Sequence, residues 1–308
     1  MSTSHVAAQA PAPTEGLTPE RLHAVLAGIC AQAGLDPRDA HLIKFTNNAV
    51  FRLASAPVVV RIAGSRAVSE RIDTVIATAQ WFAQHEVPAV RLLEEVAQPV
   101  VADGYAATLW HLVPDSGPQA TGAGLGQILS QIHQLPTPEF ALPQWSPFTQ
   151  VRTRISDAEA LADNDRDWLL ERCAQVEEQL HTLDYVLAPG VIHGDPFLGN
   201  LIPGPHGPVI CDLDSVCWGP REWDLAPVAV GKLRMDYDYD AHTPLVQEYG
   251  FDVTTWPGFD VLRQVRELKL VTSVLPILRS QPTIRPQWEH RFASLRAGDA
   301  SVRWQTYR

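Results

Sequence analysis

The amino-acid sequence predicts an α+β fold in which a small strand-rich lobe precedes a larger, mainly helical lobe. Three observations lead to this prediction. Strand patterns dominate up to residue 112, helical patterns dominate after Pro114, and 308 residues of which 45% are hydrophobic suffice for two cores. We therefore expect a disordered tail at 1–16, which is rich in Ala, Pro, Ser and Thr, an antiparallel-sheet lobe at 17–112 and a helical lobe at 113–308.

The elements of the first lobe follow from local patterns. A hairpin is expected over His41–Leu53, because two β-rich runs flank a polar Thr-Asn-Asn turn and Asn tolerates positive φ. The β-branched run at Pro57–Ile62 predicts a buried strand. Apolar residues at helical spacing predict a helix over Val68–His85. Two further strands are expected, at 87–96 and 104–113.

The second lobe is expected to consist of amphipathic helices. After Pro114, apolar residues recur three and four positions apart in four long segments, which is the periodicity of a helix with one buried face. These segments are residues 125–135, 165–183, 261–278 and 288–297.

Composition limits the partners. Lys and Arg total 24 and Asp and Glu total 35, so the formal charge is 24 − 35 = −11. Such an acidic chain is a poor candidate for nucleic-acid binding and for anionic membrane surfaces, and it favours a cationic or neutral small partner or an anion masked by metal. The four cysteines are scattered, and we find neither a signal peptide nor a membrane-spanning run, so we expect a cytoplasmic protein.

The segment Val191–Val216 carries the chemistry. An apolar dipeptide leads into His193-Gly194-Asp195, Asn200 follows five residues after Asp195, and a Gly/Pro turn precedes a second strand that ends at Asp212. Two carboxylates and an amide oxygen form a set of hard oxygen ligands, suited to Mg²⁺ with phosphates completing the shell. Phosphoryl transfer requires little more than such a metal and a carboxylate that orients the acceptor hydroxyl.

These residues resemble a known family. The motifs HGDPFLGN, CDLDSV and REWDLA, at their spacing, are similar to those of the aminoglycoside phosphotransferase and choline kinase-like family, relatives of the protein kinases. The resemblance implies a two-lobed kinase-like fold and a catalytic role for Asp195. It also implies that Asn200 and Asp212 bind magnesium, and that His193 and Asp224 support the catalytic loop.

By the same resemblance, the first lobe binds ATP or GTP. The turn over Phe45–Ala49 would cover the triphosphate with backbone N–H groups and the side chains of Thr46, Asn47 and Asn48. Arg61 would bind the α and β phosphates, in place of the lysine of protein kinases. The helix position expected to hold its acidic partner is Val75, so this partner is left open.

The predicted link between the lobes, Leu109–Val113, is the expected adenine site. The resemblance places the base between apolar side chains such as Trp110, with hydrogen bonds to the backbone of His111 and Val113. Trp110 could equally be a core residue.

The acceptor is expected to be a small molecule. Asp224 lies only twelve positions after Asp212, an interval too short for the peptide-binding segment of a protein kinase. Asp236, Asp238 and Glu267 are candidate acceptor ligands, although the first two could simply form a solvated acidic loop.

The acidic charge favours an antibiotic hydroxyl, such as that of an aminoglycoside, as the acceptor. The alternatives are a kinase of a primary metabolite (an amino alcohol, a sugar or a hydroxy amino acid) and a catalytically silent nucleotide-binding protein. The oligomeric state is open.

Overall fold

The computed structural model describes residues 17–45 and 48–307, so the predicted tail and the turn residues Thr46 and Asn47 lie outside the described residues. The chain divides into two compact units, and each is described by itself. Of the described residues, unit 1 comprises 17–45, 48–118, 138–141 and 202–214, and unit 2 comprises 119–137, 142–201 and 215–307. The predicted lobe boundaries remain a prediction.

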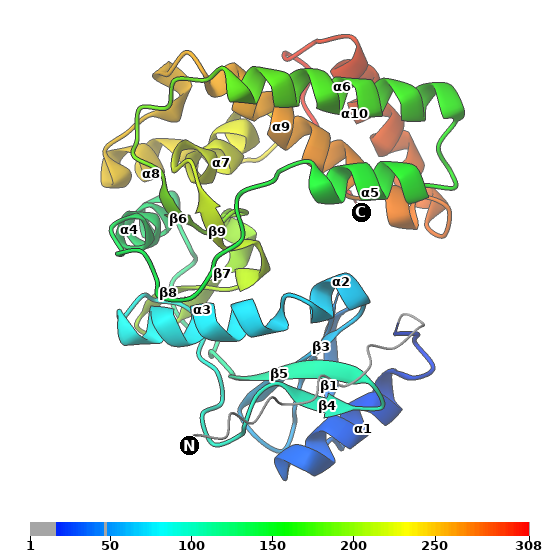
Figure 1. The fold of residues 1–308 in the computed structure, drawn as a ribbon, viewed down its shortest axis with the longest axis vertical. Coiled ribbons are helices and arrows are strands. Elements are labelled where there is room, and N and C mark those ends of the chain that lie inside the picture. Colours follow the sequence, from blue (N-terminus) through cyan, green and yellow to red (C-terminus); the bar gives the residue numbers. More distant parts are fainter. Residues whose placement is uncertain (1–16, 46–47, 308) are drawn as a thin grey trace, which may run out of the picture. The chain divides into compact units, whose positions relative to one another are not determined.

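A five-stranded antiparallel sheet forms the centre of unit 1, in the order β1-β2-β3-β5-β4 (Figure 1). The strands are β1 (His41–Phe45), β2 (Asn48–Arg52), β3 (Val58–Ala63), β4 (Val100–Ala102) and β5 (Tyr105–His111). In β3, Val58, Val60 and Ile62 are buried at alternate positions, as expected for a β-branched strand with one face against a core.

Helices cover both faces of this sheet. Figure 1 shows α1 (Leu22–Ala33) on one face and α3 (Ile72–Gln84) on the other. The buried residues of α1 recur at helical spacing and join Phe51, Ile62 and Leu109 in one hydrophobic cluster. The helix expected over Val68–His85 is instead two helices, because the short α2 (Arg66–Ser69) ends before α3 begins.

The strand expected over 87–96 does not form. Successive backbone groups of this segment bond to different partners: Val90 N–H donates to Ile210, whereas Leu93 N–H donates to Leu109. Pro88 has no N–H to contribute to a ladder, so the segment makes only isolated bridges. Farther along the chain, β7 (Leu201–Gly204) and β8 (Gly207–Ile210) form the predicted hairpin.

Unit 2 is mainly helical, with one small antiparallel pair. Its helices are α4 (Gly122–His133), α5 (Thr149–Asp157), α6 (Asp163–His181), α7 (Glu222–Arg234), α8 (His242–Tyr249), α9 (Phe259–Thr272) and α10 (Arg285–Arg296), and its strands are β6 (Gly190–Ile192) and β9 (Cys217–Gly219). Figure 1 shows α9 running through this unit, where it packs against α5, α6, α7 and α10.

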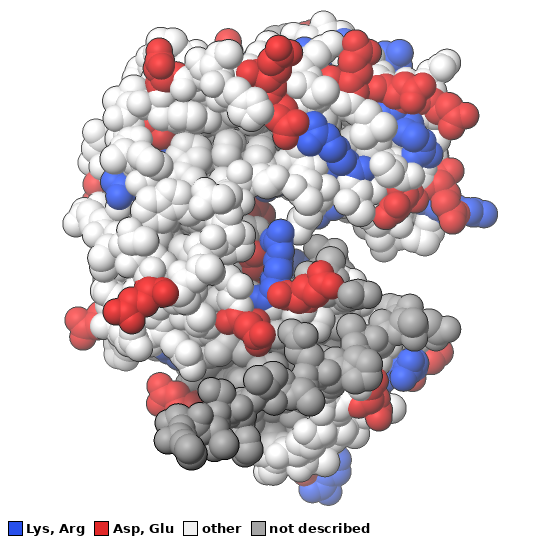
Figure 2. Space-filling model, in the orientation of Figure 1, with Lys and Arg blue, Asp and Glu red and all other residues white. Residues whose placement is uncertain are grey.

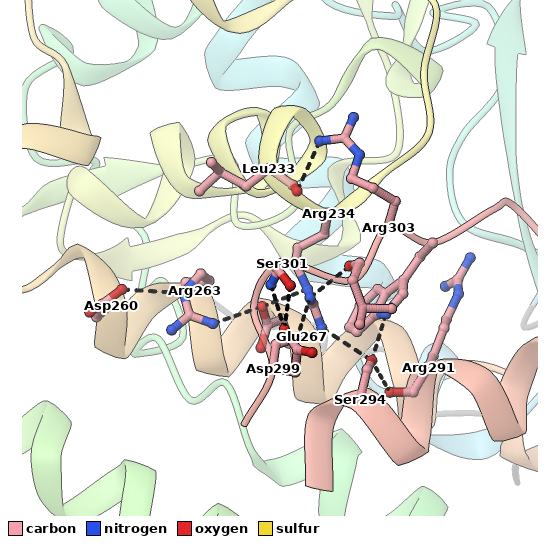
Figure 3. A network of polar contacts seen from close by, with 12 residues as sticks. Leu233, Arg234, Asp260, Arg263, Glu267, Arg291, Ser294, Asp299, Ser301 and Arg303 are labelled. Carbon is pink, nitrogen blue, oxygen red and sulfur yellow. Dashed lines mark hydrogen bonds and ion pairs between the residues drawn. The ribbon is translucent and has the colours of Figure 1, made fainter. Parts of the chain in front are cut away.

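Helix α9 has charged side chains that are buried in the interior and form ion pairs there. Arg266 and Glu267 are buried beside the apolar residues of the same helix. Buried charges are stable only when they are paired. Glu267 lies 2.9 Å from both Arg234 Nε and Arg263 Nη1, in a network that also binds the C-terminal segment (Figure 3).

The predicted fold class is confirmed: a small antiparallel-sheet unit accompanies a larger, mainly helical unit. Within the described residues, we find no helix with the length and apolarity needed to span a membrane.

Candidate active site

The candidate catalytic loop begins where β6 ends. The buried residues Val191 and Ile192 lead directly to His193, Gly194 and Asp195. Gly194 has φ +85°, and a Cβ at this position would lie 2.2 Å from the carbonyl oxygen of Ser215. Both the left-handed backbone and the close approach require glycine, so the G of the HGD motif is explained by sterics.

Asp224 holds this loop from the first turn of α7. Its carboxylate accepts hydrogen bonds from the backbone N–H groups of His193 (2.6 Å) and Gly194 (2.8 Å). The buried His133 reaches the same carboxylate through Nε2 (3.1 Å) and contacts the Tyr249 hydroxyl through Nδ1 (2.7 Å). The loop is therefore fixed by a carboxylate that is itself positioned by a side-chain network.

Asp195 is held in its ionised form by neighbouring cations. Arg266 of α9 donates a hydrogen bond to its carboxylate. Burial opposes ionisation, but the charges of Arg266 and Lys269 outweigh it and lower the pKa of Asp195 to about 2. An anionic Asp195 can accept a hydrogen bond from a hydroxyl at any physiological pH.

Asn200 has a carbonyl oxygen available for a ligand. Its amide Nδ2 donates to the backbone carbonyl of Asp195 (2.9 Å), which fixes the orientation of the side chain. Since the amide nitrogen is occupied by this bond, Oδ1 is the atom left for a cation. The residue thus fits the role of a metal ligand by the chemistry of its free atom.

In unit 1, Arg61 lies at a cluster of carboxylates. Its guanidinium contacts Asp214 and lies 3.6 Å from Asp212 Oδ1, and the backbone carbonyl of Asp214 accepts a bond from Arg71 Nη1 (3.3 Å). The partner of Arg61, which the sequence left open, is therefore Asp214 and not a residue of α3. Burial and the adjacent Asp214 raise the pKa of Asp212 to about 7, and a bound divalent cation would favour its ionised form.

Asp212 has a left-handed backbone, with φ 65°. Asp is one of the few non-glycine residues that tolerate this region, and such conformations cluster at functional sites. The strained position directs a carboxylate from the end of the β7–β8 hairpin, consistent with a ligand role for the residue.

The predicted adenine-binding residues lie at the end of β5. Trp110 is buried, and its Nε1 donates to Thr108 Oγ1 (2.8 Å), so it is held as a core residue would be. The backbone N–H of His111 already donates to Arg91 O (2.9 Å), which leaves this group unavailable to a base. Val113 lies just beyond the strand and is half-buried. Asn48, from the predicted triphosphate-binding turn, is the first residue of β2.

The three predicted acceptor ligands differ in exposure. Asp236 and Asp238 are exposed. Glu267 is buried and bound by two arginines, as described above, which gives it a structural role in this network. Their assignment to the acceptor stays a prediction that this placement does not support.

A pocket in unit 2 lies next to the candidate catalytic loop. Its cavity volume is about 60 Å³, within about 540 Å³ of empty space that includes open solvent at its mouth. Its lining includes Phe197 of the loop, Arg266, and the tyrosines Tyr237 and Tyr239, whose stacked rings lie 5.0 Å apart between centroids. Of the residues 236–239, the tyrosines and not the acids line the pocket.

Arg266, Asp214 and Trp223 were not predicted as site residues from the sequence. Trp223, whose Nε1 donates to Gly194 O (2.7 Å), could have been found from the W-D pair of the REWDLA motif, and Asp214 from its place in CDLDSV. Arg266 lies 71 positions from Asp195 on a helix without a motif, so no local signal identifies it.

A family model described as the phosphotransferase enzyme family matches residues 42–266, and the chain belongs to this family. The predicted family is thus confirmed and, with it, the enzyme class, a phosphotransferase.

The chain is also similar to a probable ketoamine kinase of Lactiplantibacillus plantarum, at 29% identity over 178 residues, which cover 48% of this chain and 62% of the relative. The match thus spans less than two thirds of that relative's length.

Two solved structures share the fold. A choline/ethanolamine kinase family protein from Mesorhizobium loti has a TM-score of 0.61 at 17% identity, covering 90% of this chain and 93% of the other. An amicoumacin kinase in complex with AMP-PNP, Ca²⁺ and Ami has a TM-score of 0.65 at 11% identity, covering 87% and 91%.

Proposed function

We propose that the protein is a small-molecule kinase, which transfers the γ-phosphoryl group of ATP to a hydroxyl group. The observation that carries the proposal is the loop after β6, where an ionised Asp195 follows two backbone N–H groups clamped by Asp224. Family membership supports this reading. ATP is the proposed donor and GTP the alternative, since neighbours in fold are complexed with AMP-PNP and with GDP.

In this proposal, Asp195 positions the acceptor. Its carboxylate accepts a hydrogen bond from the acceptor hydroxyl and directs the oxygen toward the γ-phosphorus. The low pKa makes Asp195 a weak base, so it contributes mainly orientation, which suits a loose transition state in which the proton leaves late. The clamp by Asp224 keeps the loop in one conformation.

Asn200 and Asp212 are the proposed ligands of Mg²⁺. The free Oδ1 of Asn200 and the carboxylate of Asp212 are hard oxygen donors, and the AMP-PNP complex among the fold neighbours contains a divalent cation. When bound, the metal neutralises charge on the phosphates. Arg61, held by Asp214, is the proposed phosphate-binding cation of unit 1, together with Asn48 and the neighbouring turn residues.

The test is an ADP-release assay with Mg·ATP and a library of hydroxyl-containing acceptors, comparing the wild type with Asp195→Asn. We expect turnover with the wild type, and loss of turnover in the variant with nucleotide affinity unchanged. Turnover retained in Asp195→Asn would remove Asp195 from the proposed role. Nucleotide binding without ADP release on any acceptor would favour the alternative of a catalytically silent nucleotide-binding protein.

The choice of acceptor between an antibiotic and a metabolite depends on the chemistry around Asp195. The predicted preference for an aminoglycoside rested on the overall acidic charge, and Asp236, Asp238 and Glu267 were the candidate acceptor ligands. Neither Asp236 nor Asp238 lines the pocket, and Glu267 is bound by arginines. The local charge of the site, argued next, favours the metabolite alternative.

A further inference from the structure

The geometry points to an acceptor that carries a carboxylate beside its hydroxyl group, with Arg266 binding the carboxylate and the pocket beside Phe197 holding an apolar or aromatic body. This inference rests on the proposed function and specifies its substrate class. It opposes the expectation of a cationic acceptor that the net charge of −11 suggested.

The charge around Asp195 is positive. Arg266 contacts Asp195 directly, and Lys269, one turn farther along α9, together with Arg154 of α5, acts on the same carboxylate through its charge. Among the residues that the structure describes, neither Arg154 nor Lys269 forms an ion pair. Three cations therefore act on a single carboxylate, which within the described residues is paired with Arg266, while Lys269 Nζ lies 5.0 Å from the centre of the Trp223 ring.

This local excess of positive charge around Asp195 differs from the charge distribution over the surface. On the face drawn in Figure 2, acidic and basic side chains are interspersed over the helices of unit 2. A half-buried cluster of like charges costs free energy in the absence of a counter-ion, since each charge lies in a medium less polar than water. An anionic group of the substrate is the natural counter-ion.

The charged residues that line the pocket are positive, like those around Asp195. They are Lys232 and Arg266, and no carboxylate is among the lining residues. Both are already paired, Lys232 with Asp240 (2.8 Å) and Thr243 (2.9 Å) and Arg266 with Asp195, but the guanidinium of Arg266 has further N–H donors for a ligand. Phe197, Tyr237 and Tyr239 supply apolar and aromatic surface around it.

Arg266 connects the pocket to the catalytic carboxylate. Its guanidinium lies 5.9 Å from the centre of the Phe197 ring, and it also donates to Asp195. A guanidinium has five N–H donors and binds carboxylates bidentately, so one edge can hold Asp195 while another holds the substrate. A hydroxyl near the bound carboxylate then lies within reach of Asp195.

The reaction balances with ATP as co-substrate. The acceptor oxygen forms a bond to the γ-phosphorus, the bond from that phosphorus to the β,γ-bridging oxygen breaks, and ADP leaves. The hydroxyl proton passes to Asp195 and then to solvent. The product is a phosphomonoester of a hydroxy acid, and the surrounding cations also attract its added negative charge.

The test uses matched acceptors that differ in charge. 3-Phenyllactate, 3-phenyllactamide and phenylalaninol each carry a benzyl group and one hydroxyl, and they are anionic, neutral and cationic. A second series, 3-hydroxybutyrate, its amide and 1-amino-2-propanol, lacks the ring, and an aminoglycoside panel is added. We expect kcat/KM to be at least about tenfold higher for the acids than for their amides.

Variants of the cations then test whether these residues cause the preference for acids over amides. Arg266→Ala, and to a smaller extent Lys269→Met, should lower the acid-to-amide ratio, while Arg266→Lys should partly restore it. The ratio separates binding of the carboxylate from any general loss of kcat through Asp195. Arg285→Met, an exposed cation of α10, is the matched control and should leave the ratio unchanged.

Failure of this inference can be distinguished from failure of the proposed function. The inference is overturned if amides, amines or aminoglycosides are phosphorylated as efficiently as the acids, or if neither acids nor amides are turned over or stabilise the fold. In both cases the kinase proposal is still supported if the protein binds Mg-nucleotide. If the wild type binds no Mg-nucleotide, the proposed function fails first. The comparison of wild-type acceptors does not depend on whether any variant folds.

Discussion

At the scale of single residues, Asp224 shows how one carboxylate can position a loop. Its carboxylate accepts hydrogen bonds from two buried backbone N–H groups that would otherwise have no partner. Asp224→Ala should therefore lower the free energy of unfolding by about 2–5 kcal/mol, since each orphaned buried donor costs about 1–3 kcal/mol. It should also reduce kcat roughly 100-fold by misplacing Asp195.

Chemical denaturation and ADP release measure the two effects of Asp224→Ala. Asp260→Asn serves as the control, because Asp260 is also in the first turn of a helix but is largely exposed, so its removal should change stability by less than about 1 kcal/mol. Full kcat in Asp224→Ala would show that the loop keeps its conformation without this clamp.

Gly194 combines a conformational requirement with a steric one, and the two can be separated. Gly250 has φ +87°, close to the +85° of Gly194, but a Cβ on Gly250 meets open space. Gly250→Ala should cost about 1–2 kcal/mol, the penalty of a left-handed residue. Gly194→Ala should cost about 1–3 kcal/mol more, from overlap with Ser215 O, and should abolish turnover. Equal melting temperatures for the two variants would refute the steric argument.

The site residues differ in how far the sequence could predict them. Asp195, Asn200, Asp212 and Asp224 could be predicted as site residues because they stand in short motifs at fixed spacing. Arg266 escaped prediction because its proximity to Asp195 depends on the packing of α9, which no local pattern specifies. Charge summed over the chain gave the opposite sign to the charge at the site, because a sum contains no information on position.

At the scale of elements, strands and helices with strong periodicity were predicted and their interruptions were not. The hairpin of β1 and β2 and the strand β3 followed from β-branched alternation and a polar turn. The break between α2 and α3 and the irregular segment after Val87 depend on tertiary partners, such as the bonds of Val90 and Leu93 to separate strands. Periodicity alone does not contain these partners.

Helix α9 places its two buried charged residues, Arg266 and Glu267, in different sets of contacts. Arg266 faces Asp195, whereas Glu267 binds Arg234 and Arg263 in the network of Figure 3. Glu267→Gln should lower the free energy of unfolding by about 3–5 kcal/mol, because two arginines lose their counter-charge in a buried site. It should leave the KM of the acceptor within about twofold, since the network is structural.

The acceptor role predicted for Glu267 gives the opposite outcome. If Glu267 bound the acceptor, Glu267→Gln would raise KM strongly and change the melting temperature little. Arg263→Met is the matched variant, because it removes one of the two partners of Glu267 and should destabilise in the same direction but less. Thermal melts and acceptor KM values from the same preparations decide between the two roles.

At the scale of the whole molecule, the proposed roles are distributed over the two units. Unit 1 contains Arg61, Asp212 and Asp214, which we assign to the nucleotide and its metal; unit 2 contains Asn200, the other proposed metal ligand, together with Asp195, Arg266 and the pocket, which we assign to the acceptor. A ligand that binds the folded chain and not the unfolded chain stabilises the fold by RT ln(1 + [L]/Kd). Nucleotide binding can therefore be measured without knowledge of the acceptor.

AMP-PNP with Mg²⁺, at about 100 times its Kd, should stabilise the fold by about 2.7 kcal/mol, and a chelator should remove most of that gain. Asp212→Asn should weaken the metal-dependent part, because it removes a charged oxygen ligand. Asp195→Asn should keep it, because in our assignment Asp195 contacts the acceptor and not the metal. Differential scanning calorimetry with and without Mg²⁺ measures each effect. The same stabilisation without Mg²⁺, or its loss in Asp195→Asn and not in Asp212→Asn, would contradict the assignment of metal and acceptor roles to these two carboxylates.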